Sequence, residues 1–174
     1  MKLTEHAVLG GNYEIIHILE QKGISFNDVI ALAPVCRPEI FDWLLNHYET
    51  GDKLQACAKF INEGMWPYAL ALLKKKDVSC TLMKQKRVFD GLLNIASRAR
   101  AFLVVKHLVA IDKANKSKIK KDEPNSTALC YASGGGHFNI VKYLIKECHC
   151  NPEAKDNDGK TALDLAYENI NIQI

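Results

Sequence analysis

The segment Cys148-His149-Cys150 places three potential metal ligands side by side. A zinc site needs four ligands in tetrahedral geometry, usually supplied as two separated pairs. The second pair is missing here, and nothing in the spacing requires Cys130 or His137 to approach. The pattern therefore predicts a turn between two helical segments, and we expect no metal and no cofactor.

Nucleophilic catalysis needs a cysteine or serine held within hydrogen-bond reach of a base. The chain has six cysteines and six histidines, but no local signature that pairs a nucleophile with a base. Because no secretion signal accompanies the cysteines, we expect reduced thiols. We predict that the chain is not an enzyme. An active site scattered along the chain is the alternative, and it would require a pocket with convergent groups of shifted pKa.

The glycine run Ser133-Gly134-Gly135-Gly136-His137 invites comparison with a phosphate-binding loop. Such a loop follows a strand and ends in lysine followed by serine or threonine. Here the glycines follow a helical pattern and precede Phe138-Asn139-Ile140, so the context predicts a helix–turn–helix instead.

Basic residues form two clusters that could attract an acidic partner or nucleic acid. The first comprises Lys113, Lys116, Lys118, Lys120 and Lys121, and the second comprises Lys74, Lys75, Lys76, Lys84, Lys86 and Arg87. Neither cluster has the interleaved aromatic residues with which proteins stack on single strands, and the net charge is only +3. We expect a solvated connection over residues 111–121. An electrostatic adaptor for nucleic acid or an acidic partner is the alternative function.

The composition of the 174-residue chain is that of a folded soluble protein, with 48% hydrophobic and 25% charged residues. No run of about 18 apolar residues exists, so no segment is expected to span a membrane. The N-terminus has no apolar core of a signal peptide. We therefore expect the protein in the cytoplasm or the nucleus.

A repeated helical unit must position all of these residues. Residues 132–145 show it best, with Ala132, a glycine turn, and then Ile140, Val141 and Leu144. Residues 7–19 and 96–109 repeat the pattern, and weaker copies start at positions 33 and 58. Apolar residues at i, i+3 and i+4 predict two short helices with one apolar face. One pair cannot bury that face alone, so neighbouring pairs must stack.

Two segments, 126–132 and 160–166, resemble the ankyrin signature T-P-L-H-x-A, and residues 151–159 resemble the finger that links ankyrin repeats. Thr127 and Thr161 lie 34 residues apart, against a family period of about 33. The chain is thus similar to the ankyrin-repeat family, clearly over 122–167 and as shortened, degenerate repeats over 1–113. The family histidine is replaced by Cys130 and Asp164, so its bond to the threonine is expected to be absent or altered.

The resemblance implies an all-α, ankyrin-type solenoid of stacked helix–turn–helix repeats with few or no strands. We predict a single array over 1–174, interrupted by the Lys-rich connection over 111–121 and incomplete at both ends. The predicted repeats are 1–24, 25–50, 51–79, 80–113, 122–155 and a partial repeat over 156–174.

The resemblance also implies a non-catalytic scaffold, which binds a protein partner through the concave face formed by first helices and fingers. Carried over by position, the partner-binding residues are Glu123, Ser126, Asn157, Asp158, Lys160 and Glu168. We expect a monomer that does not bind nucleic acid.

Overall fold

The computed structural model describes residues 3–26, 29, 38–47, 50–114, 124–156 and 158–172. Contacts divide the chain into two compact units, Met1–Val78 and Ser79–Ile174. The boundary falls inside helix α6, Lys76–Lys84. A single array over 1–174 remains a prediction, so each unit is considered by itself.

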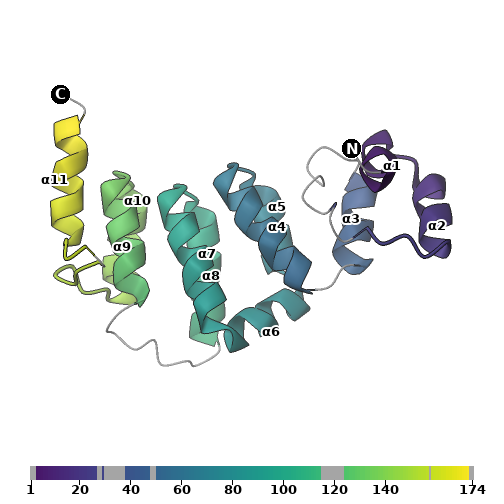
Figure 1. The fold of residues 1–174 in the computed structure, drawn as a ribbon. Coiled ribbons are helices and arrows are strands. Elements are labelled where there is room, and N and C mark those ends of the chain that lie inside the picture. The colour runs from purple at the N-terminus through teal and green to yellow at the C-terminus, as the bar shows by residue number, and fades with distance from the viewer. Residues whose placement is uncertain are drawn as a thin grey trace. The chain divides into compact units, whose positions relative to one another are not determined.

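Helices make up most of the described structure in both units (Figure 1). Before α6, the helices are α1 Leu3–Gly10, α2 Tyr13–Gln21, α3 Pro38–His47, α4 Thr50–Asn62 and α5 Trp66–Leu73. After α6, they are α7 Lys86–Arg98, α8 Phe102–Ala114, α9 Pro124–Gly134, α10 Phe138–Cys148 and α11 Ala162–Ile172. Within the described ranges there is no strand, only an isolated antiparallel bridge between Lys155 and Thr161. The predicted all-α, ankyrin-type fold is confirmed.

One turn geometry joins the two helices of several pairs. In three turns, an amide donates to the carbonyl oxygen five residues earlier, and these bonds recur every 36 residues: Met65 to Phe60 at 2.8 Å, Ala101 to Ala96 at 2.9 Å and His137 to Ala132 at 2.8 Å. This 6→1 bond is typical of a helix end followed by a left-handed residue. Gly64 and Gly136 supply that residue with φ of 75° and 66°, whereas Arg100 occupies it with φ of 59°.

The glycine run therefore forms a helix–turn–helix, as its context predicts. Helix α9 ends at Gly134, and α10 begins at Phe138. His149 follows α10 in a left-handed conformation, with φ of 53°. The Cys148-His149-Cys150 segment is thus the predicted turn after a helix.

Equivalent leucines of three second helices form the interior. Leu72, Leu108 and Leu144, also 36 residues apart, are completely buried. Burying one leucine side chain stabilises the fold by about 1.5–3 kcal/mol relative to leaving it exposed. Ala96 and Ala132 at the ends of the preceding first helices are also completely buried. Their small side chains allow the paired helices to approach closely, which explains the alanine in the repeated pattern.

Trp43 organises the core of the first unit. Its ring is buried and makes edge contacts with Tyr13 and Phe26, at centroid distances of 6.2 and 5.9 Å. It also stacks on His47 at 4.6 Å. Such pairs contribute about 0.5–1.5 kcal/mol each beyond the area they bury.

In the second unit, the first helices α7, α9 and α11 pack in series, and the second helices α8 and α10 contact each other behind them. Two side-chain contacts to helix-terminal carbonyls fix this stack. The imidazole Nε2 of His137 lies 2.9 Å from the carbonyl oxygen of Arg98, the last residue of α7. The amide of Asn169 in α11 donates to the carbonyl oxygen of Gly134, the last residue of α9. In both cases the following repeat provides a partner for a carbonyl that the helix itself leaves unpaired.

Candidate functional site

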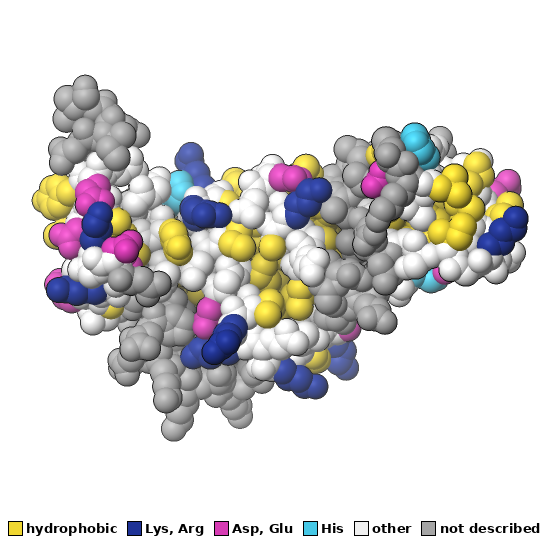
Figure 2. Space-filling view, viewed as in Figure 1, with side chains coloured by type: hydrophobic (Ala, Val, Ile, Leu, Met, Phe, Trp, Pro, Cys, Tyr) yellow, Lys and Arg dark blue, Asp and Glu magenta, His cyan; other side chains and the backbone are white. Residues whose placement is uncertain are grey.

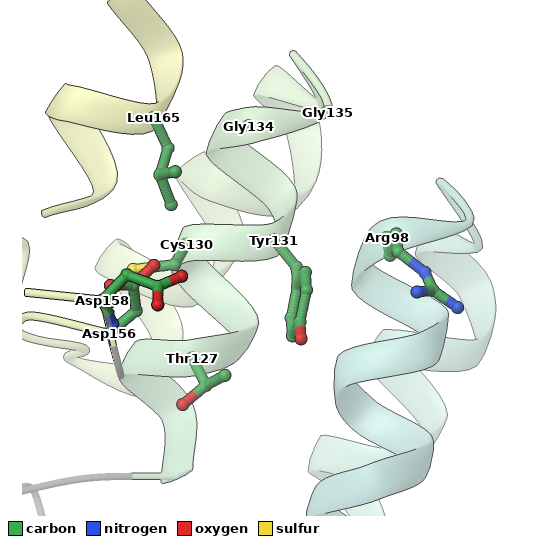
Figure 3. Close-up of a pocket in the computed structure, with 9 residues that line it drawn as sticks. All are labelled: Arg98, Thr127, Cys130, Tyr131, Gly134, Gly135, Asp156, Asp158 and Leu165. Atoms are coloured by element: carbon green, nitrogen blue, oxygen red, sulfur yellow. Dashed lines mark hydrogen bonds between the residues drawn. The ribbon is translucent and has the colours of Figure 1, made fainter. Parts of the chain in front are cut away.

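A groove of about 440 Å³ lies along α9 in the second unit (Figure 3). Helix α9 forms its floor, α7 contributes one wall and the segment before α11 contributes the other. We call it the first-helix groove, and its residues are Arg98, Thr127, Cys130, Tyr131, Gly134, Gly135, Asp156, Asp158 and Leu165. Its volume falls within the range of about 300–1,000 Å³ of sites that hold small ligands.

The floor follows from helical spacing. Thr127, Tyr131 and Gly134 lie at i, i+4 and i+7, so they share one face of α9. Tyr131 has 43% of its surface exposed, whereas Cys130 beside it is buried. Gly134 adds no side chain to the floor, and a Cβ atom there would make an ordinary van der Waals contact, at 3.6 Å, with Cβ of Leu165 in α11. The groove thus presents one large aromatic side chain at its centre.

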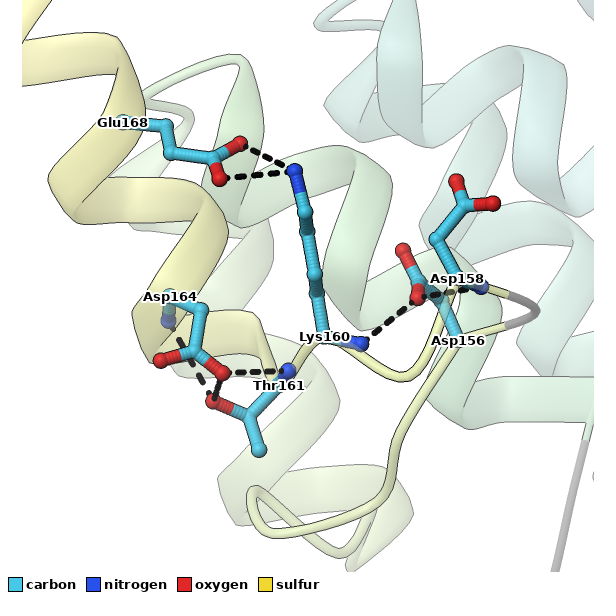
Figure 4. Close-up of polar contacts among 6 residues, drawn as sticks. All are labelled: Asp156, Asp158, Lys160, Thr161, Asp164 and Glu168. Atoms are coloured by element: carbon cyan, nitrogen blue, oxygen red, sulfur yellow. Dashed lines mark hydrogen bonds and ion pairs between the residues drawn. The ribbon is translucent and has the colours of Figure 1, made fainter.

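The acidic wall belongs to the finger, which we define as residues 150–156 and 158–161. Its conformation is held by the Asp156 carboxylate, whose Oδ1 accepts from the amides of Asp158 and Lys160, both at 2.9 Å (Figure 4). The Asp156 amide donates in turn to the carbonyl oxygen of Lys160 at 2.8 Å. These bonds fix the backbone of the finger and place the exposed Asp158 side chain on the groove.

Helix α11 begins with a reciprocal cap between Thr161 and Asp164 (Figure 4). Oδ2 of Asp164 accepts from the amide and the hydroxyl of Thr161, at 2.9 and 2.8 Å. The Asp164 amide donates to the Thr161 hydroxyl at 3.2 Å. This arrangement is a capping box with aspartate in place of the usual glutamate. The bond that the family histidine makes to the threonine is therefore altered here, and Asp164 takes it over.

The hydrogen bonds from Thr161 lower the pKa of Asp164, first through the backbone amide and then through the hydroxyl. Burial opposes this shift weakly, and Lys155 and Lys160 add to it. The carboxylate thus stays charged at the helix N-terminus, where negative charge is favourable.

Lys160 and Glu168 pair with each other at the edge of this region. The Lys160 ammonium lies 2.7 and 2.8 Å from the two carboxylate oxygens of Glu168 (Figure 4). The Glu168 hydrogen bond and charge, with smaller contributions from Asp158 and Asp156, raise the pKa of Lys160. Because both side chains are exposed, the pair positions them more than it stabilises the fold.

The predicted partner-binding residues are only partly brought together. Asp158 lines the groove, while Lys160 and Glu168 lie close by as an ion pair. Ser126 is in the first turn of α9, and the description does not extend to its side chain. Glu123 and Asn157 lie outside the described residues, as do the lysines at 116, 118, 120 and 121.

The sequence interpretation missed Tyr131 and Arg98. Tyr131 could have been found, because it lies one helical turn after the signature threonine on the same face. Arg98 could not, because only the packing of α7 against α9 brings it to the groove.

Burial leaves several thiols protonated and therefore poor nucleophiles. Burial raises the pKa of Cys130, and the nearby Asp156 charge raises it further. Burial raises the pKa of Cys57 to about 12, of Cys148 to about 11 and of Cys150 to about 12. Among the residues that the structure describes, no three His, Cys, Asp or Glu side chains are grouped so that they could hold a metal ion.

None of the helices in the described part of the chain combines the length and the apolar character needed to cross a bilayer.

Two relatives share a short stretch with this chain: the mitochondrial liver isoform of glutaminase from Rattus norvegicus and the same protein from Mus musculus. Each is 38% identical to it over 55 residues. These residues make up 32% of this chain but only 9% of each glutaminase. The chain thus spans about a tenth of the length of these relatives, and the match is to an ankyrin-repeat segment.

A family profile described as ankyrin repeats in three copies matches residues 92–174. The match starts well before residue 122, where the recognisable signature begins. It covers the C-terminal part of α7 and all of α8 to α11, which are the helices that build the groove and its supporting stack. Over residues 92–174, therefore, this chain belongs to the ankyrin-repeat family.

Proposed function

We propose that the chain is a non-catalytic scaffold that holds a segment of a partner protein in the first-helix groove. Ankyrin repeats are in general protein–protein interaction modules. The observation that carries the proposal is the exposed Tyr131 side chain, which lies between Arg98 on one wall and the two aspartates on the other. Tyrosine and arginine are enriched among the residues that dominate binding energy at protein interfaces.

The chemistry of the groove suggests what such a segment carries. Asp156 and Asp158 suit a lysine or arginine side chain, or hydrogen-bond donors, on the finger side. Tyr131 and Leu165 offer apolar surface to an aliphatic or aromatic side chain. The finger and α9 are held by the bonds described above, so binding orders little additional backbone and costs less entropy.

Site-specific photo-crosslinking tests this proposal. A benzophenone amino acid replaces Tyr131 in the full chain, and in a matched control it replaces Lys142, an exposed residue of α10. Irradiation in an extract of the source cells should give a discrete crosslinked protein from position 131 only. An Asp158→Lys change in the same chain should weaken that crosslink by about tenfold or more.

The proposal fails if both positions crosslink the same proteins, or if position 131 gives no crosslink. It also fails if the product is insensitive to Asp158→Lys while the variant keeps the wild-type circular dichroism spectrum.

A further inference from the structure

A second cavity, of about 320 Å³, lies between the α7–α8 turn and the α9–α10 turn. We call it the turn-edge cavity. Its walls include Arg100 and Phe102 from the first turn, and His137 and Phe138 from the second, with the start of α10 behind them. None of the first-helix groove residues lines it, so it is a separate feature of the second unit.

The walls are held in place by several contacts. The hydrogen bond between His137 and the Arg98 carbonyl joins the two turns. The Phe102 ring packs edge-on against Tyr143 of α10, with the ring centroids 5.7 Å apart. Ile140 behind the cavity is buried. The cavity is thus formed before any partner arrives, which lowers the entropy cost of binding.

One large apolar side chain projects into solvent at this cavity, and a second follows a lining residue in the sequence. Phe138 is 70% exposed, the largest exposed fraction among the large hydrophobic residues of the described chain. Leu103, next to Phe102 in α8, is 60% exposed. A strongly exposed aromatic ring that lines a preformed cavity is suited to anchor a partner, since aromatic residues are enriched at interfaces.

The charge at this edge is positive. Arg100 is exposed at the rim, and the Lys106 ammonium lies 5.7 Å from the centre of the Phe102 ring. Among the described residues that line the cavity there is no acidic side chain. In Figure 2, dark-blue and cyan side chains lie over the α7–α8 and α9–α10 turns, whereas magenta and dark-blue side chains are mixed over the finger and α11.

The acidic residues of the flanking helices are at their far ends. Asp90 precedes the end of α7 by eight residues, which corresponds to about 12 Å along the helix axis. Asp112 follows the start of α8 by ten residues, or about 15 Å. These two carboxylates are therefore too far along their helices to neutralise the positive charge of Arg100 at the turn edge.

We propose that the turn-edge cavity docks an acidic segment of a partner protein that carries an aromatic or aliphatic side chain. The apolar side chain enters the cavity between Phe102 and Phe138, and the flanking carboxylates lie beside Arg100 and Lys106. A nucleic acid fits less well, because strand binding uses a track of basic residues with successive stacking aromatics. Here one strongly exposed aromatic ring stands beside one small cavity.

Selection from a random peptide display library with the full chain as bait tests this inference. Enriched peptides should combine Asp or Glu with a central Phe, Tyr, Trp or Leu. The best peptide, labelled with fluorescein, is then titrated against variants by fluorescence anisotropy. Arg100→Gly and Phe138→Ser should each weaken binding by about tenfold. Lys146→Gln, which removes an exposed positive charge from the other end of α10, should leave binding within about twofold.

A loss of peptide binding in Arg100→Gly cannot be attributed to misfolding, because glycine relieves the left-handed backbone at this position. Tyr131→Ala in the first-helix groove should not change the affinity for the acidic peptide. A failure of the turn-edge inference is therefore distinguishable from a failure of the scaffold proposal.

The inference is overturned if no acidic peptide with a central apolar side chain is enriched. It is equally overturned if acidic peptides bind both turn-edge variants normally, or lose affinity only with Tyr131→Ala. A fluorescein-labelled oligothymidine that binds the chain and is lost in the same two variants would assign the cavity to nucleic acid instead.

Discussion

The imidazole of His137 reaches across one repeat to the carbonyl oxygen of Arg98, at 2.9 Å. This contact ties the α9–α10 turn to the end of α7, and it supports a wall of the turn-edge cavity. Gly135 makes room for it, because a Cβ atom there would lie only 2.6 Å from Nε2 of His137. Gly135 is thus explained by the position of this imidazole, and Gly136 by its left-handed backbone.

Replacing His137 with alanine should lower the free energy of unfolding by about 1 kcal/mol, the net value of a typical hydrogen bond. Gly135→Ala should lower it at least as much, because the added methyl group displaces the imidazole ring. Urea unfolding followed by circular dichroism measures both. His17→Ala, at an exposed position in α2, is the control and should be nearly neutral. Wild-type stability in both test variants would contradict the role of this contact.

Arg100→Gly should stabilise the protein. Arg100 adopts φ of 59° where the equivalent turns have glycine, and a left-handed conformation costs other residues about 1–2 kcal/mol. After the greater chain entropy of glycine in the unfolded state is subtracted, we expect a gain of about 1 kcal/mol. Thermal and urea unfolding provide the measurement.

The neighbouring Ala99→Gly is the matched control for this substitution. Ala99 has φ of −81°, so glycine there offers no relief and should cost about 0.5–1 kcal/mol. A loss of stability in Arg100→Gly equal to that in Ala99→Gly would show that backbone strain is not what distinguishes position 100.

A buried lysine joins α4 to α6. The Lys53 ammonium lies 2.7 Å from the Asp77 carboxylate, and the two side chains are 5% and 43% exposed. Asp77→Asn leaves the Lys53 charge buried without its counterion and should cost about 2 kcal/mol, less than for a fully buried pair because water reaches Asp77. Adding Lys53→Met should restore much of that loss.

Denaturant midpoints of the two single variants and the double variant complete the cycle. Lys160→Met, which breaks the exposed pair with Glu168, should leave the midpoint nearly unchanged. If the double variant is no more stable than Asp77→Asn alone, the unpaired buried charge of Lys53 is not the cause of the stability loss in Asp77→Asn.

The cap at α11 should make part of the stability depend on pH. Because the pKa of Asp164 is lower in the folded protein than in the unfolded chain, its contribution is complete above the ordinary aspartate pKa of about 3.9. The contribution is lost as the pH falls through the lower folded value. The stability difference between wild type and Asp164→Ala should therefore be constant near neutral pH and shrink in strong acid.

Urea titrations of both proteins at several acidic pH values measure that difference. Asp158→Ala is the control, because the Asp158 side chain does not cap the helix. A difference that stays constant down to the lowest pH would rule out the ionised carboxylate as the capping group.

The local sequence was sufficient to predict the all-α fold, the turn over the glycine run and the resemblance to ankyrin repeats. Leu72, Leu108 and Leu144 are buried where the 36-residue spacing places them, because helical periodicity and turn residues act within a few positions of the chain. Asp158 reached the groove for the same reason, since the finger's shape depends on bonds between residues two to four apart.

Contacts between distant residues were decided only by the tertiary structure. Lys53 and Asp77 lie 24 positions apart, and His137 and Arg98 lie 39 apart. The periodicity of one helix does not specify which side chains of a neighbouring helix will contact it. The position of Arg98 opposite Tyr131, the division into two units inside α6 and the turn-edge cavity all arise from how separate helices pack, and packing depends on the summed shape of both surfaces.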